Sequence, residues 1–213
     1  MEAKLQRQQR SLATRNLILD CAEIEFFRAS IARTTLDGIA SASGMTRGAI
    51  YGHFDNKHRL LSAIFDRSAI SLDPFTIPEL GPVPCCLDAL RQGLFACMRD
   101  VLLDGRKRRL YSIAHSASIT EPECLLFGDT VRDAGELARL RIRYALERAT
   151  IAGEIHVDDC PDSAAVHIHA CLTGYFLLSL RKSPPQSPEQ NAVRVVAYAL
   201  SPLDRSIRNG SPQ

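Results

Sequence analysis

The sequence has no tryptophan, and aromatic residues make up only 6% of its 213 residues. It also has no run of about 18 consecutive apolar residues, the length from which a membrane-spanning helix is inferred. The N-terminus is polar and basic, and it lacks the apolar core of a signal peptide. These absences predict a cytoplasmic protein that has no membrane partner.

The usual short motifs of enzymes are missing too. We find no glycine-rich phosphate loop, no GxSxG nucleophile elbow and no HExxH zinc motif. Asp158-Asp159 is a pair of carboxylates, but it precedes a predicted helix and is typical of a cap and loop. We therefore expect a protein that is not an enzyme and needs no cofactor, and catalysis is a distant alternative.

Seven cysteines are present, and none of them is in a CxxC pair. In a reducing compartment most are expected to be buried as small apolar residues. His167 and Cys171 are four residues apart on a predicted helix, but a zinc site needs three or four converging ligands. Cys85-Cys86 is a candidate for thiol redox sensing. We predict no metal site, and metal or redox sensing stays open as an alternative.

Charge is distributed unevenly although the net charge is only +2. Residues 1–69 contain ten Lys or Arg against seven Asp or Glu, a net charge of +3, which leaves −1 for the rest. The excess suits a polyanionic partner such as DNA. Met1 to Arg15 is polar and basic, and it is predicted to be either an arm that reaches DNA or a solvated, disordered tail.

The stretch from Thr34 to Lys57 predicts two short helices joined by a tight turn. Thr34 and Asp37 resemble a capping box at the start of the first helix. Gly44 follows where the apolar periodicity stops, and glycine enters the left-handed conformation without steric cost. Thr46 is a second N-cap, and it opens a helix over Arg47–Phe54. This is the geometry of a helix-turn-helix, whose second helix enters the major groove of DNA.

The outer face of the second helix carries residue types that read DNA. Arg47 is predicted to fork onto O6 and N7 of a guanine. The next two residues are small, which allows close approach, and Tyr51 offers a hydroxyl and a ring. A plain helical hairpin with a solvated face is the alternative. The predicted DNA-binding residues are Thr34, Thr35, Thr46, Arg47, Gly48, Ala49, Tyr51, His53 and Lys57.

Residues 14–65 closely resemble the DNA-binding domain of the TetR family of bacterial transcriptional regulators. Two positions depart from the family pattern: Ser30 replaces a glycine that usually follows the first helix, and Gly52 replaces a larger residue. The matching residues are Ile18-Leu19-Asp20, Ala22, Phe26, Thr34-Thr35-Leu36, Ile39-Ala40, Gly44 through Tyr51, His53-Phe54, Lys57 and Leu60-Leu61.

The rest of the chain predicts more helices and no strands, so the fold class is all-α with about nine helices. Prolines between Asp73 and Pro84 interrupt helical structure and mark a domain boundary. We expect an N-terminal arm with a three-helix DNA-binding domain over 1–56, a linking helix over 57–72, and a ligand-binding and dimerisation domain over 73–213. The other predicted helices are 17–27, 57–71, 85–103, 106–118, 121–152, 162–182 and 189–200.

The last two predicted helices are strongly apolar, and they predict a homodimer through a four-helix bundle. Two-fold symmetry matches a palindromic double-stranded operator with half-sites about 34–36 Å apart, or a multiple of that. The alternative is burial of both helices inside one subunit.

Residues 85–182 resemble, less specifically, the ligand domain of efflux-pump repressors of the AcrR and TtgR type. The resemblance implies a small hydrophobic inducer that binds among the helices and releases DNA, and hence a repressor of a multidrug efflux operon. The matching runs are Arg108-Arg109-Leu110, Leu146 through Ala149, Gly153-Glu154, His169-Ala170 and Leu172-Thr173-Gly174. The predicted lining residues are Phe95, Met98, Leu102, His115, Phe127, Leu140, Cys171 and Phe176.

Overall fold

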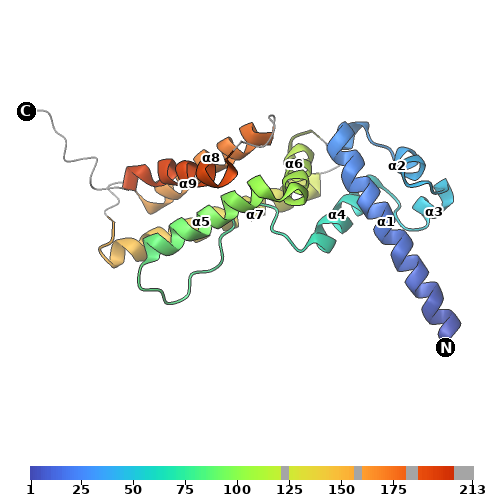
Figure 1. Ribbon diagram of the computed structural model, residues 1–213, viewed down its shortest axis with the longest axis horizontal. Helices are drawn as coiled ribbons and strands as arrows, with labels where there is room; N and C mark the ends of the chain where they lie inside the picture. Colours follow the sequence, from blue (N-terminus) through green and yellow to red (C-terminus); the bar gives the residue numbers. More distant parts are fainter. Residues whose placement is uncertain (121–124, 156–159, 181–186, 204–213) are drawn as a thin grey trace, which may run out of the picture. The chain divides into compact units, whose positions relative to one another are not determined.

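The computed structural model describes residues 1–120, 125–155, 160–180 and 187–203 (Figure 1). Within these ranges the regular elements are nine α-helices and one short 3-10 helix, η2 (Ser201–Leu203), which confirms the all-α prediction. The chain divides into two compact units. Unit 1 comprises residues 1–72 and 109–131, and unit 2 comprises residues 73–108 and those from 132 onward.

Helix α1 (Glu2–Arg33) starts much earlier than predicted. We expected the helix to start at Leu17, and the alternative of a disordered tail before it was wrong, whereas an arm that reaches DNA stays a prediction. The segment is polar, but it contains neither glycine nor proline, and its acidic first-turn residue Glu2 suits a helix N-terminus. Residues 1–13 are all exposed, so this part of the helix is not stabilised by a core.

Near its end α1 is interrupted at Ser30, whose φ is 70° and ψ is 160°. This conformation is accessible almost only to glycine, so the serine is strained here. The Thr34 hydroxyl donates a hydrogen bond of 2.7 Å to the carbonyl of Ser30 and supports the turn. A glycine, which the resemblance to the TetR family led us to expect here, would adopt this conformation with less strain.

The helix-turn-helix forms as expected, with two changes at its ends. In α2 (Leu36–Ser43) the N-cap is Thr35, which accepts a hydrogen bond from Gly38 N at 3.0 Å. Our assignment of the cap to Thr34 was wrong, because that hydroxyl donates to α1 instead. Gly44 is left-handed, with φ 67°, and ends α2.

Helix α3 (Arg47–Tyr51) is capped by Thr46, which accepts a hydrogen bond from Ala49 N at 3.2 Å. It ends at Tyr51 rather than at Phe54, since residues 52–53 form a turn. Helix α4 (Lys57–Ser68) follows, with Asn56 as its cap. It is three residues shorter than predicted.

One hydrophobic core holds unit 1 together, and buried residues of the α6 and α7 segments contribute to it. Within this core the rings of Phe65 and Phe127 pack 5.1 Å apart. A buried carboxylate, Glu23, pairs with Arg109 at 3.1 Å. The core includes Ile18, Leu19, Ala22, Phe26, Ile31, Leu36, Ile39, Ile50, Phe54, Leu60, Leu61, Ile64, Leu110 and Ile113.

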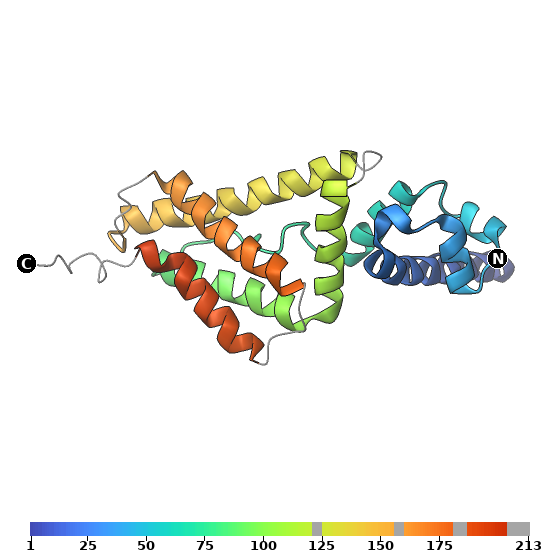
Figure 2. The same cartoon turned by 90° about the horizontal axis from the view of Figure 1, so that it is seen from above.

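Unit 2 contains α5, α8 and α9 together with parts of α6 and α7 (Figure 2). Helix α9 packs against both α5 and α8, and α5 also contacts α8. α6 and α7 each belong to both units: residues 109–120 and 125–131 lie in unit 1. The helices are α5 (Cys86–Leu103), α6 (Gly105–Thr120), α7 (Leu125–Ile151), α8 (Pro161–Leu180) and α9 (Pro188–Leu200).

The boundaries of these helices agree with the predictions to within a few residues where they are described. Gly153 lies past the end of α7 with φ 71°, as its position predicted. The predicted starts at 121–124, the pair Asp158-Asp159, the end of the 162–182 helix and the tail from 204 lie outside the described residues.

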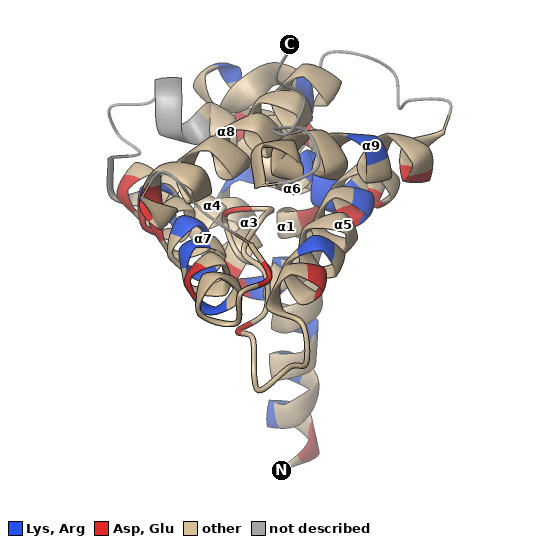
Figure 3. Cartoon of the chain, turned by 90° about the vertical axis from the view of Figure 1, so that its left-hand side faces the viewer, with Lys and Arg blue, Asp and Glu red and all other residues tan. Residues whose placement is uncertain are grey.

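Helix α8 differs from its neighbours in charge. Figure 3 shows charged residues of both signs over α5 and α7, whereas α8 contains only Asp162. In the described part of the chain α8 is also the one helix long and apolar enough to cross a membrane, a test that core helices of soluble proteins pass too. Only 28% of its most apolar window is buried, so much apolar surface faces outward.

Candidate nucleic-acid interface

One face of helix α3 packs in the core of unit 1, and its other face is exposed at the surface. Ile50 is fully buried in the core of unit 1, and Phe54 just after the helix is buried as well. Thr46, Arg47, Gly48 and Tyr51 are exposed. The fold therefore displays the predicted reading residues at the surface without using them for packing.

Arg47 is paired across the turn with Asp37 of α2. Its Nε donates to Asp37 Oδ1 at 2.5 Å, and its Nη2 contacts the second carboxylate oxygen, so the pair is bidentate. The hydrogen bond to Asp37 raises the pKa of the Arg47 guanidinium, which stays charged. The Arg47 side chain is still 73% exposed. Sequence reasoning missed this pair because it joins residues ten positions apart.

The remaining predicted DNA-binding residues fall into different settings. Thr35 is exposed but its hydroxyl caps α2, and Thr34 is buried and bonded to α1, which places it away from the exposed set. Ala49 and His53 are half-buried. Lys57 donates its ammonium to the carbonyl of Ile31 at 3.0 Å, so it also holds the start of α4 against the end of α1.

The N-terminal part of α1 adds positive charge to unit 1. Lys4, Arg7 and Arg10 are exposed on this helix. Arg15 stacks over the ring of Phe54 at 5.2 Å from its centre, a cation–π contact that sequence reasoning did not identify. A basic helix, rather than a tail, accompanies the reading surface of this unit.

The predicted inducer-lining residues do not form one group. Met98, Leu102 and Phe176 are buried in unit 2, and Phe95 is half-buried. The other four lie outside the interior of unit 2, and their role in binding an inducer stays a prediction. Leu140 and Cys171 are exposed, and His115 and Phe127 belong to unit 1, where Phe127 packs on Phe65. An apolar residue in a helix does not by itself reveal which way it faces.

Leu140 instead lies in a surface cavity of unit 2 of about 400 Å³. This cavity lies between α7 and the segment that leads to α5. Leu137 and Tyr144 line it beside Leu140, together with Pro78 and Leu80 of that segment. Arg141 and Arg148 donate to carbonyls of the same segment and hold it along α7.

The sulfur and imidazole groups do not assemble a site in the part of the chain that is described. His167 Nε2 and Cys171 Sγ lie 3.6 Å apart, but no group of three or more His, Cys, Asp or Glu is placed to hold a metal there. Cys85 donates its thiol to Glu154 at 3.2 Å. A backbone N–H lowers the pKa of Cys85, yet its bond to Glu154 and desolvation raise it overall, which disfavours the reactive thiolate.

A small helical unit with a capped, exposed second helix, joined to a larger helical unit, defines a helix-turn-helix DNA-binding protein. Residues 18–64 match the family described as bacterial regulatory proteins, tetR family. The chain is 30% identical over 174 residues to the "Probable HTH-type transcriptional regulator ArpR" of Pseudomonas putida, which covers 78% of this chain and 81% of that one. The chain belongs to the TetR family and is a DNA-binding transcription regulator.

Two solved structures are similar over nearly the whole chain. NalD of Pseudomonas aeruginosa, the secondary repressor of the MexAB-OprM multidrug efflux pump, has a TM-score of 0.77 and 25% identity, covering 92% of this chain and 98% of its own. SmeT, the repressor of the SmeDEF pump of Stenotrophomonas maltophilia, bound to triclosan, has a TM-score of 0.71 and 25% identity, covering 94% and 98%.

Proposed function

We propose that this regulator represses a multidrug efflux operon and leaves its operator when a small apolar or aromatic molecule binds unit 2. The observation that carries the proposal is the exposed face of α3, held by Ile50 and headed by Arg47. The efflux repressors NalD and SmeT support it through their similarity along both units. Repressors of this kind act where the chromosome is, so we place the protein in the cytoplasm.

In this proposal Arg47 reads the operator and its neighbours position the helix. A guanidinium that forks onto a carboxylate can fork onto guanine O6 and N7, because both present two acceptors side by side. Tyr51 contacts a phosphate or a thymine methyl. His53 and Lys57 lie toward the phosphates and set the register. Residues 1–56 would form the reading domain and 57–72 its link to the body.

The test of this assignment compares two arginines of unit 1. Arg47→Ala and Arg59→Ala remove the same charge, and both side chains are exposed. In anisotropy titrations with DNA that flanks the protein's own gene and with random duplex, we expect Arg47→Ala to lose operator preference by about 1–3 kcal/mol. Arg59→Ala should keep the preference. Full preference in Arg47→Ala would refute base reading by this residue.

The dimer is proposed to form through α8 and α9. Val166, Ala170, Gly174 and Leu178 follow each other at four-residue spacing on α8, and all four are exposed. A Cβ added at Gly174 would meet nothing within 4 Å, so a second helix has room to approach there. Exposed Val193 and Tyr198 continue the apolar surface on α9. Pairing two copies of this surface buries it.

The inducer is proposed to be an apolar aromatic compound. Triclosan, a compound of this kind, is bound to SmeT in the solved complex. Among the predicted lining residues, Met98, Leu102 and Phe176 keep a place in the interior of unit 2. By linkage, a ligand that weakens operator binding is itself bound more weakly when DNA is present.

The inducer is tested by titrating triclosan into the preformed operator complex. We expect release of DNA, and a smaller response in Phe176→Ala than in wild type. If neither triclosan nor a panel of apolar drugs and dyes shifts the operator affinity, the protein is a DNA-binding regulator without an inducer.

A further inference from the structure

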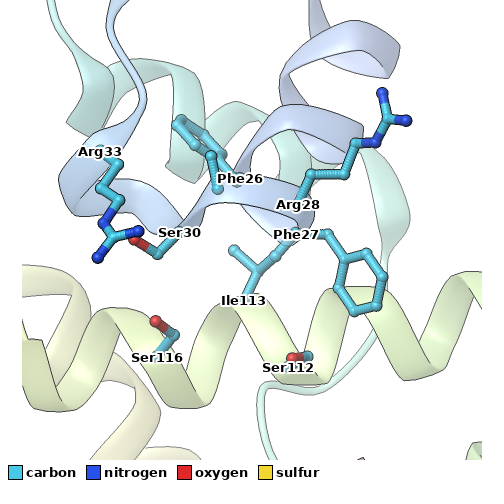
Figure 4. Close-up of a pocket in the computed structure, with 9 residues that line it drawn as sticks. Phe26, Phe27, Arg28, Ser30, Arg33, Ser112, Ile113 and Ser116 are labelled. Carbon is cyan, nitrogen blue, oxygen red and sulfur yellow. The ribbon is translucent and has the colours of Figure 1, made fainter.

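Unit 1 contains a cavity of about 410 Å³ between the last turns of α1 and the middle of α6 (Figure 4). Its size falls in the range of small-molecule sites. Residues 26–30 and Arg33 line it from α1, and Ser112, Ile113 and Ser116 line it from α6. It shares no lining residue with the proposed reading surface or with the proposed inducer site.

One end of the cavity is polar and the other is apolar. Figure 4 shows the Arg33 guanidinium and the Ser30 hydroxyl together at one end, facing the hydroxyl of Ser116 across the cavity. Phe26 and Ile113 are buried and form the apolar wall. The ring of Phe27 is 46% exposed at the rim. No Asp or Glu lines the cavity.

The charge of Arg33 is not balanced by a carboxylate among the described residues, since no ion pair of Arg33 occurs there. Arg28 is different: its guanidinium lies 3.9 Å from Glu25, and Figure 4 shows it pointing away from α6. The polar end therefore offers the planar guanidinium of Arg33 and the hydroxyl of Ser30. These groups match the two oxygens of a carboxylate.

The backbone of Ser30 supports a binding site independently of the charge of Arg33. It is held at φ 70° and ψ 160°, a conformation that glycine adopts with less strain. Strained residues of this kind cluster at binding sites, and here the strained residue is the one that brings a hydroxyl to the cavity.

We propose that this cavity is a ligand site for a small aromatic carboxylate. The carboxylate binds the Arg33 guanidinium and the Ser30 hydroxyl, and the ring packs on Phe26 and Ile113. The site is separate from the inducer site proposed for unit 2, so a negative result at one site does not bear on the other.

The first test uses 1-naphthoate as the probe and the full-length protein. Because the chain has no tryptophan, naphthalene emission can be followed without its interference. We expect saturable binding of 1-naphthoate, with affinity at least about tenfold lower in Arg33→Gln. Arg10→Gln removes the same charge from an exposed position of α1 outside the cavity and should bind as wild type does. The neutral 1-naphthamide should bind more weakly than 1-naphthoate.

The second test locates the probe. In protein with carbon-13-labelled isoleucine methyl groups, the Ile113 resonance, assigned with Ile113→Val, should shift on titration and stay in place in Arg33→Gln. Ser30→Gly, which should fold more stably, is expected to bind 1-naphthoate more weakly. Equal affinity in Arg33→Gln and wild type, or an unmoved Ile113 resonance at saturation, would overturn the proposal.

Discussion

At the scale of single residues, the pairing of Arg47 with Asp37 bears most on the proposed reading of DNA. The carboxylate fixes the guanidinium at the start of α3 and places a negative charge beside it. In the proposed complex this pair is exchanged for contacts between Arg47 and DNA. We therefore propose that Asp37 favours the operator, whose bases replace its oxygens, over random DNA.

The first prediction is that Asp37→Ala raises affinity for random duplex several-fold and lowers the ratio of operator to random affinity. The negative charge is lost, and a released guanidinium contacts phosphates of any sequence. Asp37→Asn keeps a hydrogen-bond acceptor but loses the charge, so its ratio of operator to random affinity should fall between those of wild type and Asp37→Ala. Anisotropy titrations at two salt concentrations measure both effects. An unchanged ratio in Asp37→Ala would show that the pair has no part in selectivity.

The second prediction concerns Ser30. Ser30→Gly should raise the free energy of unfolding by about 1 kcal/mol, because it relieves backbone strain of about 1–3 kcal/mol and adds entropy of about 0.5–1 kcal/mol to the unfolded chain. A rise of about 2–4 °C in the melting temperature is expected. Ala29→Gly, one residue earlier in the helix, should instead be destabilising. A lower melting temperature for Ser30→Gly would contradict the strain argument.

Residue-level prediction from the sequence succeeded where the signal is local. Thr46 and Gly44 are a cap and a left-handed turn, as their neighbours indicated. The pair Arg47–Asp37 and the stacking of Arg15 on Phe54 depend on the angles between helices, which no spacing rule contains.

At the scale of elements, Glu154 joins the end of α7 to the start of α5. One carboxylate oxygen accepts from Cys86 N at 2.9 Å and the other from Leu87 N at 2.8 Å. These two N–H groups would otherwise have no partner in the first turn of α5. The same hydrogen bonds lower the pKa of Glu154, so the charged form is favoured in the folded state.

The third prediction follows from the sign of that shift. A carboxyl with a depressed folded pKa stabilises above its unfolded pKa of about 4.3, and the effect is lost as pH falls through the folded pKa. Glu154→Gln should therefore melt below wild type at pH 7, and the difference should shrink below about pH 4. Glu147→Gln, on the side of α7, should show a smaller difference at pH 7. A difference for Glu154→Gln that does not depend on pH would contradict a charged cap.

Element types were predictable and element ends were less so. Helical periodicity and the positions of glycine and proline located all nine described helices, because helix breakers are local signals. The start of α1 was missed because polarity was read as disorder. The end of α3 was missed because the turn at 52–53 depends on how Phe54 enters the core.

At the scale of the whole molecule, the exposed apolar stripe of α8 is the feature that indicates binding of a second subunit. The described chain leaves Leu178 64% exposed and Tyr198 69% exposed. Large exposed apolar side chains on two neighbouring helices, Leu178 on α8 and Tyr198 on α9, are typical of an interface.

The fourth prediction is that Leu178→Glu shifts the protein to a monomer in analytical ultracentrifugation. Operator binding should weaken as well, because a monomer binds only one half-site of the palindrome. Ile151→Glu changes an even more exposed apolar residue, 87% exposed, at the end of α7 and should leave the dimer intact. Retention of the dimer in Leu178→Glu would place the interface elsewhere.

The surroundings of the predicted inducer-lining residues were the least predictable part of the molecule from sequence. Leu140 and Cys171 face outward and Phe127 packs in unit 1, although each is apolar and lies on a predicted helix. A cavity depends on which helix faces converge over long sequence distances. The helix-turn-helix was predictable because its residues lie within one short stretch of chain.

The most direct test of the account is selection of fragments of the host genome by purified wild-type protein and by Arg47→Ala, followed by sequencing. We predict that wild type enriches a few fragments that share an inverted repeat, including the region beside its own gene, and that Arg47→Ala enriches none of them. Absence of any enriched repeat with wild type, or the same fragments with Arg47→Ala, would contradict operator reading by α3.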